Sequence, residues 1–406
     1  MVFRCPNATA DDPYHTLQIV QQDEPLRRVS DDPNPFLAYQ PYFAWDAFAE
    51  ASGMTPDARA ALVVETDERV AAVAGTGFAI SPFARADALS EALGFGPTGG
   101  VWIKDETHQV AGSHKSRHLF STLLMLLVAE QSGGTSWGVR AVDRPTLAIA
   151  SCGNAAVAAA TLARAVQWPI QVFVPANANP HVVARLYELQ ATVTTCPRRD
   201  TDLPGDPCVL RYREAVARGS IPFSVQGPEN AWCLDGGRSI GWEMADQPLD
   251  RLFVQVGGGA LARCAIGGMG QVGSLPKLHA VQTQGCAPFA RAWRRALDGP
   301  GGLATAARRW STCMTPWETE PTSAADGILD DETYDWLGVA NGMAASGGSP
   351  VVVAESDVLQ ANELAVQHTS IDASHTGTAG LAGLLAIRAN IGNGERVAVI
   401  FSGVRR

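Results

Sequence analysis

The sequence predicts an α/β protein with two doubly wound parallel sheets. Short apolar segments rich in β-branched residues alternate with helical segments from Gly99 onward, and short links join them. This alternation is typical of parallel βαβ units. The chain has 406 residues, 46% hydrophobic and 18% charged, which suffices for two buried cores. Strands are expected at residues 101–104, 146–150, 170–174, 191–195, 251–256, 277–281 and 396–401, and helices at 56–74, 113–129, 154–166 and 181–190.

Charge and composition exclude several classes of function. The 31 basic and 41 acidic residues give a net charge of −10 without a basic run, which argues against nucleic acid or an anionic membrane as partner. The longest apolar stretch, 123–129, is far shorter than the roughly 20 residues of a membrane span. No apolar signal core follows Arg4–Asn7, so we expect a cytoplasmic protein. The eight cysteines form no C-x-x-C pair, and we predict no metal site.

Lysine is rare in this sequence. Of 31 basic residues only Lys104, Lys115 and Lys277 are lysines, and the other 28 are arginines. An amine, unlike a guanidinium, can lose its proton and form a Schiff base. Lys115 lies in the first turn of the helix expected at 113–129, where the helix dipole disfavours an ammonium ion. Lys115 is therefore the candidate for covalent chemistry.

Two loops between a strand and a helix are candidate anion sites. Backbone N–H groups at such junctions bind carboxylates or phosphates. One loop consists of Ser151, Cys152, Gly153, Asn154 and Ala155. The other consists of Gly257, Gly258, Gly259 and Ala260, where glycines permit close approach of a phosphate. The second loop matches neither the dinucleotide-binding G-x-G-x-x-G pattern with a following acid nor a P-loop.

Together these features resemble the fold-type II pyridoxal-phosphate family, which includes threonine dehydratase, serine racemase and threonine synthase. Residues 104–117 match the family pattern K-x-E-x-x-Q-x-x-G-S-x-K-x-R at every fixed position, and the resemblance covers residues 76–406. It implies the tryptophan synthase β-like fold: a large domain of 76–117 and 225–406, a small domain of 118–224, and pyridoxal 5'-phosphate in the cleft between them. Residues 1–75 are expected to be an N-terminal extension packed on this body. The resemblance further implies a small-molecule amino-acid substrate and a homodimer.

The resemblance also implies a role for each matching residue. Lys115 forms the Schiff base and later acts as base or acid at the substrate carbons. The loop of Ser151 to Ala155 holds the substrate carboxylate. The other cofactor contacts are Asn154 on the phenolic oxygen, Gly257, Gly258, Gly259 and Ala260 on the phosphate, His114 near the phosphate as in the tryptophan synthase β subunit, and Ser402 on the pyridine nitrogen.

The implied reaction is elimination or replacement at the β or γ carbon of a small hydroxy or phospho-hydroxy amino acid. A neutral hydroxyl such as Ser402 does not hold the ring nitrogen protonated, which weakens the electron sink and favours loss of a leaving group. Segments 234–241 and 372–377 resemble threonine synthase, whereas 325–328 and 402–403 resemble threonine dehydratase, so elimination and replacement both stay open.

Two further alternatives remain. Cys152, where relatives carry Ser or Thr, is either a buried thiol that packs or a second base opposite Lys115, as a racemase or epimerase would need. The chain is alternatively an inactive homologue that binds pyridoxal phosphate.

Overall fold

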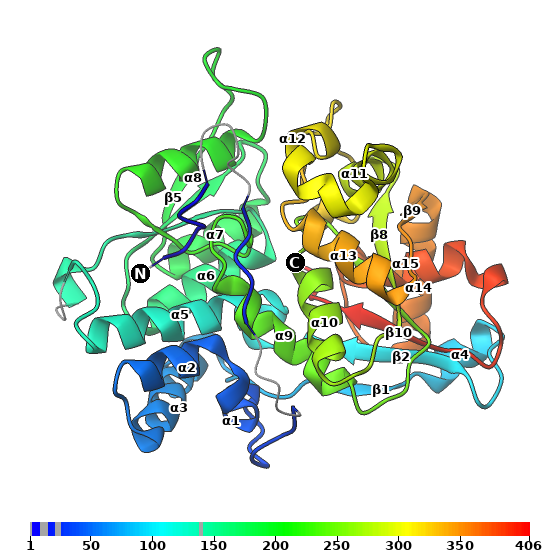
Figure 1. Cartoon of the computed structure of the whole chain (residues 1–406), viewed down its shortest axis with the longest axis horizontal. Helices are drawn as coiled ribbons and strands as arrows, with labels where there is room; N and C mark the ends of the chain where they lie inside the picture. The colour runs from blue at the N-terminus through cyan, green and yellow to red at the C-terminus, as the bar shows by residue number, and fades with distance from the viewer. Residues whose placement is uncertain (1, 9–14, 21–25, 138–140) are drawn as a thin grey trace. The chain divides into compact units, whose positions relative to one another are not determined.

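The computed structural model describes residues 2–8, 15–20, 26–137 and 141–406, which form two compact units (Figure 1). Residues 1, 9–14 and 21–25 of the predicted N-terminal extension lie outside the described residues. The first unit contains residues 1–80, 109–239 and 406, and the second contains 81–108 and 240–405.

The first unit is built on a four-stranded parallel sheet. Because parallel strands need long crossover connections, a helix follows each of its first three strands. Two of these helices begin with a capping side chain followed by proline at the first helical position: Asn179 accepts from His181 N–H, and Asp206 accepts from Cys208 N–H. The sheet order is β5-β4-β3-β6, with β3 Leu147–Ala150, β4 Ile170–Val174, β5 Thr192–Thr195, β6 Ile221–Pro222, α6 Asn154–Ala165, α7 Pro180–Glu188 and α8 Pro207–Ala217.

The N-terminal helices belong to this first unit and pack on α5, Lys115–Gln131, through aromatic side chains. The ring of Phe120 on α5 lies 4.7 Å from that of Phe36 and 4.3 Å from that of Phe78. Such ring pairs bury large apolar areas and favour defined geometries. The N-terminal helices are α1 Pro35–Ala38, η1 Gln40–Tyr42, α2 Ala44–Ala51 and α3 Pro56–Ala74, and two short turns, η2 Val110–Gly112 and η3 Ala141–Asp143, lie before and after α5.

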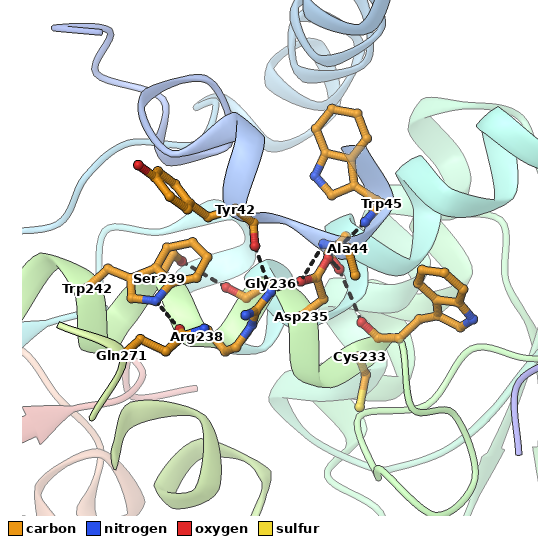
Figure 2. Close-up of polar contacts among 12 residues, drawn as sticks. Tyr42, Ala44, Trp45, Cys233, Asp235, Gly236, Arg238, Ser239, Trp242 and Gln271 are labelled. Atoms are coloured by element: carbon orange, nitrogen blue, oxygen red, sulfur yellow. Dashed lines mark hydrogen bonds and ion pairs between the residues drawn. The ribbon is translucent and has the colours of Figure 1, made fainter. Parts of the chain in front are cut away.

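Asp235 joins α9, Cys233–Met244, to the start of α2 (Figure 2). Its fully buried carboxylate accepts hydrogen bonds from the N–H groups of Ala44 (2.9 Å) and Trp45 (3.2 Å). The same carboxylate pairs with Arg238, which also donates to the Tyr42 carbonyl at 2.9 Å. The negative charge at the N-terminus of α2 is favourable, because the unsatisfied N–H groups there are positive.

The second unit is built on a six-stranded sheet that is parallel except for its edge strand β1. Helix α15, His375–Ala386, packs on β7, β8 and β10, and glycines on α15 permit this contact. A side chain at Gly380 would meet the Phe253 carbonyl at 2.9 Å. The sheet order is β1-β2-β10-β7-β8-β9, with β1 Phe83–Arg85, β2 Gly100–Asp105, β7 Arg251–Gln255, β8 Lys277–Thr283, β9 Val351–Val353 and β10 Arg396–Phe401.

The remaining helices of the second unit follow its strands. Helix α10 connects β7 to β8, and α14 packs against α15 and α4. Their bounds are α4 Asp87–Ala92, α10 Ala260–Gln271, α11 Pro288–Asp298, η4 Gly302–Arg309, α12 Trp310–Cys313, η5 Asp326–Ile328, α13 Trp336–Ser346, α14 Glu355–Thr369 and η6 Arg388–Asn390.

The boundaries of the two units differ from the boundaries of the predicted domains. The predicted small domain, 118–224, lies wholly within the first unit, which in addition holds 1–80 and 225–239. The contacts of Asp235 with α2 give the reason, because they tie the first part of α9 to the N-terminal helices.

The described residues contain neither a membrane-spanning helix nor a cluster of metal-binding side chains. None of the helices within 2–8, 15–20, 26–137 and 141–406 has both the length and the apolarity to cross a membrane. In the same part of the chain, no group of three or more His, Cys, Asp or Glu residues is placed to hold a metal ion.

Candidate active site

Lys115 is the first residue of α5 and is half-buried. The turn before it is tightly wound, with φ angles of 55° at Ala111 and 68° at Gly112. A left-handed conformation is uncommon for alanine and persists only where the surrounding structure enforces it. The helix expected at 113–129 begins at Lys115 instead of Ser113, and the side chain of its N-cap residue His114 makes no capping bond.

The other two lysines have different surroundings. Lys104 is fully buried on β2, where its ammonium donates to the Ser81 carbonyl at 2.7 Å and pairs with the buried carboxylate of Glu243. A buried ion pair of this kind holds the amine in its charged form. Lys277 starts β8 and is exposed. Lys115 therefore differs from both in standing at a helix start beside a candidate anion loop.

His118 lies one turn after His114 and is fully buried on α5. The two imidazole rings meet edge to face, with centroids 5.6 Å apart. His118 Nδ1 lies 2.8 Å from the Cys233 carbonyl. Because a carbonyl oxygen can only accept, Nδ1 is the donor, and the neutral ring keeps its lone pair on Nε2. Burial, with the nearby Lys115 charge, lowers the pKa of His118 from 6.5 to about 3.

We expect the free energy of unfolding to decrease as the pH falls, because His118 is buried in its neutral form. The unfolded chain takes up a proton near pH 6.5, whereas the folded chain resists it until about pH 3. The His118 contribution is therefore complete above pH 6.5 and is lost as the pH falls below it, with a slope that approaches about 1.4 kcal/mol per pH unit. Urea unfolding of wild type and of His118→Asn between pH 7 and pH 5 measures this effect.

The matched control is the exposed histidine His108, whose side chain is 82% exposed. His108→Asn should retain the pH dependence of the wild type, whereas His118→Asn should flatten it. Equal pH dependence in His118→Asn and wild type would contradict the assignment of a neutral buried imidazole.

The loop of residues 151–155 connects β3 to α6. Gly153 is the N-cap of α6, no side chain caps this helix, and Gly153 N–H donates to Ser151 Oγ at 3.4 Å. The thiol of Cys152 belongs to an exposed residue, so the interpretation of a buried packing thiol is wrong. The exposed thiol keeps its place as a candidate reactive group.

Asn154 receives a hydrogen bond that sequence reasoning missed. Arg406 Nε donates to Asn154 Oδ1 at 2.6 Å, and Arg406 Nη2 donates to the Ala111 carbonyl. Arg406 thereby brings Asn154 together with the turn that precedes Lys115. Because a guanidinium can only donate, the carboxamide oxygen must face it, which leaves the Nδ2 group of Asn154 as the available donor. No sequence pattern predicts this contact.

The glycine loop of residues 257–260 connects β7 to α10. Gly259 is the N-cap of α10 with φ at 95°, and no side chain caps the helix. Within the part of the chain that the structure describes, the N–H groups of 257–260 have no hydrogen-bond acceptor. A side chain at Gly257 would collide with Asp330 and would lie 2.9 Å from Ile328 Cα. The loop thus presents several donors, and a side chain is excluded at Gly257 and strained at Gly259.

We expect Gly259→Ala to weaken cofactor binding. At φ 95° an alanine is strained, and its Cβ would lie 3.0 Å from Thr333 Cγ2. Shifting this backbone displaces the N–H donors, so the Kd for pyridoxal phosphate should rise about tenfold, equivalent to about 1.4 kcal/mol. Gly267→Ala on the same helix is the control, because its side chain would enter open space. A Kd unchanged in Gly259→Ala would contradict the role of the loop.

Ser402 follows β10 and is buried. Its Oγ accepts a hydrogen bond of 2.6 Å from Nε2 of Gln255, the last residue of β7. Gln255 therefore brings Ser402 together with the glycine loop that begins two residues later. Sequence reasoning missed Gln255, although a polar residue inside the apolar run 252–256 was a signal.

These groups fit pyridoxal phosphate. The cofactor offers an aldehyde, a phosphate, a phenolic oxygen and a pyridine nitrogen. The first unit supplies the Lys115 amine and the Asn154 Nδ2 donor. The second unit supplies the N–H groups of 257–260 for an anion and the hydroxyl of Ser402. Each unit, taken by itself, thus carries partners for part of the cofactor: an amine and an amide donor in the first, and anion-binding N–H groups and a hydroxyl in the second.

Comparison with known proteins gives one family match and many structural matches. The family described as "Pyridoxal-phosphate dependent enzyme" matches residues 76–403. Threonine deaminase isoform 2 from Solanum lycopersicum is 17% identical, with a TM-score of 0.63 over 97% of this chain and 96% of that chain. Diaminopropionate ammonia lyase from Escherichia coli is 15% identical, with a TM-score of 0.63 over 85% of this chain and 88% of that chain. Maize serine racemase is 16% identical, with a TM-score of 0.61 over 84% of this chain and 92% of that chain. No curated protein matches the chain.

Proposed function

Because the chain belongs to the family of pyridoxal-phosphate dependent enzymes, we propose that it catalyses elimination or replacement at the β or γ carbon of a small hydroxy or phospho-hydroxy amino acid. The observation that carries this proposal is the hydroxyl of Ser402, which takes the position of the pyridine partner in the resemblance. A hydroxyl, unlike a carboxylate, does not hold the ring nitrogen protonated. The cofactor when bound supplies an electron sink at the substrate α carbon, and with a neutral ring this sink is weak.

The residues of the candidate site have separate roles in this proposal. The amine of Lys115 takes the α proton of the substrate and returns a proton later. The backbone N–H groups of 151–155 would hold the substrate carboxylate, and the Nδ2 group of Asn154 would donate to the phenolic oxygen of the cofactor. The orphan N–H groups of 257–260 anchor the phosphate. A substrate whose carboxylate is held in this way beside the anchored cofactor stays in the site until its leaving group departs.

The test is a panel of L-serine, L-threonine and O-phosphohomoserine with the holoenzyme. Keto acid and ammonia from a hydroxy amino acid would establish elimination, and threonine with inorganic phosphate from O-phosphohomoserine would establish replacement. Either product should disappear in Lys115→Ala. A holoenzyme that releases neither product from any of the three substrates contradicts the proposal and favours an inactive homologue.

The exposed thiol of Cys152 favours racemisation or epimerisation as a second candidate function. This reaction needs a base on each face of the substrate, and a thiolate beside a cationic site is a suitable second base. Chiral chromatography of the same panel detects the inverted amino acid. Inversion that is lost in Cys152→Ala, with elimination unchanged, would support this function. Full inversion in Cys152→Ala would exclude Cys152 as the second base.

A further inference from the structure

Gln255 is buried at the end of β7, with 4% of its surface exposed. Its Nε2 group lies 3.1 Å from the Gly377 carbonyl, 3.1 Å from the Ile400 carbonyl and 2.6 Å from Ser402 Oγ. Two of these three neighbours are backbone carbonyls, which can only accept hydrogen bonds. The NH2 end of the carboxamide must therefore face them, so the orientation of the Gln255 side chain is determined.

This orientation decides the direction of the bond to Ser402. An amide NH2 group has no acceptor capacity, so Gln255 donates and Ser402 Oγ accepts. The single hydroxyl hydrogen of Ser402 therefore points away from the Gln255 NH2 group. When a hydroxyl oxygen accepts a hydrogen bond, its own O–H group becomes a stronger donor and its remaining lone pair a weaker acceptor.

Gln255 is further held in place from its other side. Its Oε1 atom is buried and finds no hydrogen-bond partner among the described residues. A side chain at Gly380 would lie 3.0 Å from this oxygen, so α15 closes the space behind it. The backbone of Ser402 is fixed as well, because its N–H donates to the Gly377 carbonyl at 3.3 Å. The Gly377 carbonyl therefore contacts both Gln255 and Ser402 and helps to fix their relative position.

We propose that Gln255 is a positioning residue that forces Ser402 to act as a hydrogen-bond donor toward the pyridine nitrogen of the cofactor. A nitrogen that accepts from a hydroxyl keeps its lone pair, so the ring stays unprotonated. This inference deepens the proposed function, on which it rests, because an unprotonated ring disfavours long-lived carbanions and hence transamination. The determinant of the reaction class is then the pair of Gln255 and Ser402 rather than Ser402 alone.

The test is the 15N resonance of the bound cofactor, labelled at the pyridine nitrogen, in the holoenzyme without substrate. Wild type should show the resonance of an unprotonated pyridine throughout the pH range in which the protein is folded. Gln255→Met removes the donor without placing a carboxyl group against the Gly377 and Ile400 carbonyls, so the Ser402 hydroxyl is released from accepting at residue 255 and should accept from the ring. The resonance should then move toward that of a protonated pyridine.

Gln282→Met is the matched control. Gln282 is a buried glutamine on the neighbouring strand β8, and its Nε2 group donates to the Val256 carbonyl at 3.1 Å rather than to Ser402. It should leave the 15N resonance at the wild-type position. Gln255→Leu, which also removes the donor, covers the case in which Gln255→Met fails to fold and should move the resonance in the same direction.

The possible results are distinct. A wild-type resonance at the protonated position, or one that is unchanged in both Gln255 variants, would overturn the inference. Neither result depends on turnover, so failure of the inference is distinguishable from failure of the proposed elimination or replacement, which the substrate panel tests separately.

Discussion

Lys115→Ala is expected to lower turnover by at least about 10²–10⁴-fold, the usual contribution of a general acid or base, because it removes both the covalent anchor and the proton acceptor. The loss should extend to the first proton transfer. Wild type in D2O should exchange the α proton of a bound amino acid for deuterium, and Lys115→Ala should not. Proton NMR of the amino acid measures this exchange without requiring that any leaving group depart.

Lys277→Ala is the matched control for this prediction, because Lys277 is an exposed lysine of the same chain. It should exchange the α proton at the wild-type rate. Exchange that persists in Lys115→Ala at more than about a hundredth of the wild-type rate would mean that another group removes the proton, with Cys152 as the next candidate.

Asp235→Ala is expected to destabilise the first unit by about 3–5 kcal/mol, the usual cost of leaving a buried charge without its partner. The carboxylate of Asp235 is fully buried between α9 and the start of α2, and its loss removes a counter-charge from the guanidinium of Arg238 (Figure 2). The N–H groups of Ala44 and Trp45 lose their acceptor at the same time. The midpoint and slope of urea unfolding, followed by tryptophan fluorescence, measure the change.

A double variant separates the buried charge from simple loss of packing. Asp235→Ala combined with Arg238→Met removes both charges, and should be more stable than Asp235→Ala alone. Glu188→Ala, which breaks an exposed ion pair with Arg185, should cost no more than about 1 kcal/mol. If the double variant were no more stable than Asp235→Ala, the loss of a counter-charge from Arg238 would not be the cause.

The fold could be predicted where the local pattern alone decides the structure. The apolar runs 170–174 and 396–401 coincide with β4 and β10, because both strands are buried on two faces. Helix α3 spans Pro56–Ala74 as expected, since Thr55 caps its start and Gly75 ends it in the left-handed conformation. The predicted fold class, family and cofactor are confirmed by the family match over 76–403 and by the structural matches.

What the sequence could not show depends on contacts between distant residues. The start of α5 at Lys115 rather than at Ser113 follows from the wound turn at Ala111, which no local propensity favours. The contact between Asn154 and Arg406 joins residues 252 positions apart. The bond between Gln255 and Ser402 joins residues 147 positions apart, and its direction follows from two carbonyls on β10 and α15. The roles of Lys115, Asn154, Gly257–Ala260 and Ser402 stay predictions that the experiments above address.

The assignment of Lys115 as the Schiff-base residue is tested by identifying the lysine that carries the cofactor in the holoenzyme. The holoenzyme is reduced with borohydride, digested, and analysed by mass spectrometry for the added pyridoxyl group. Only three lysines exist in the chain, so the result is unambiguous. We expect the modification on the peptide that contains Lys115 and on no other lysine. A pyridoxyl group on Lys104 or Lys277, or none on any lysine, would contradict the account.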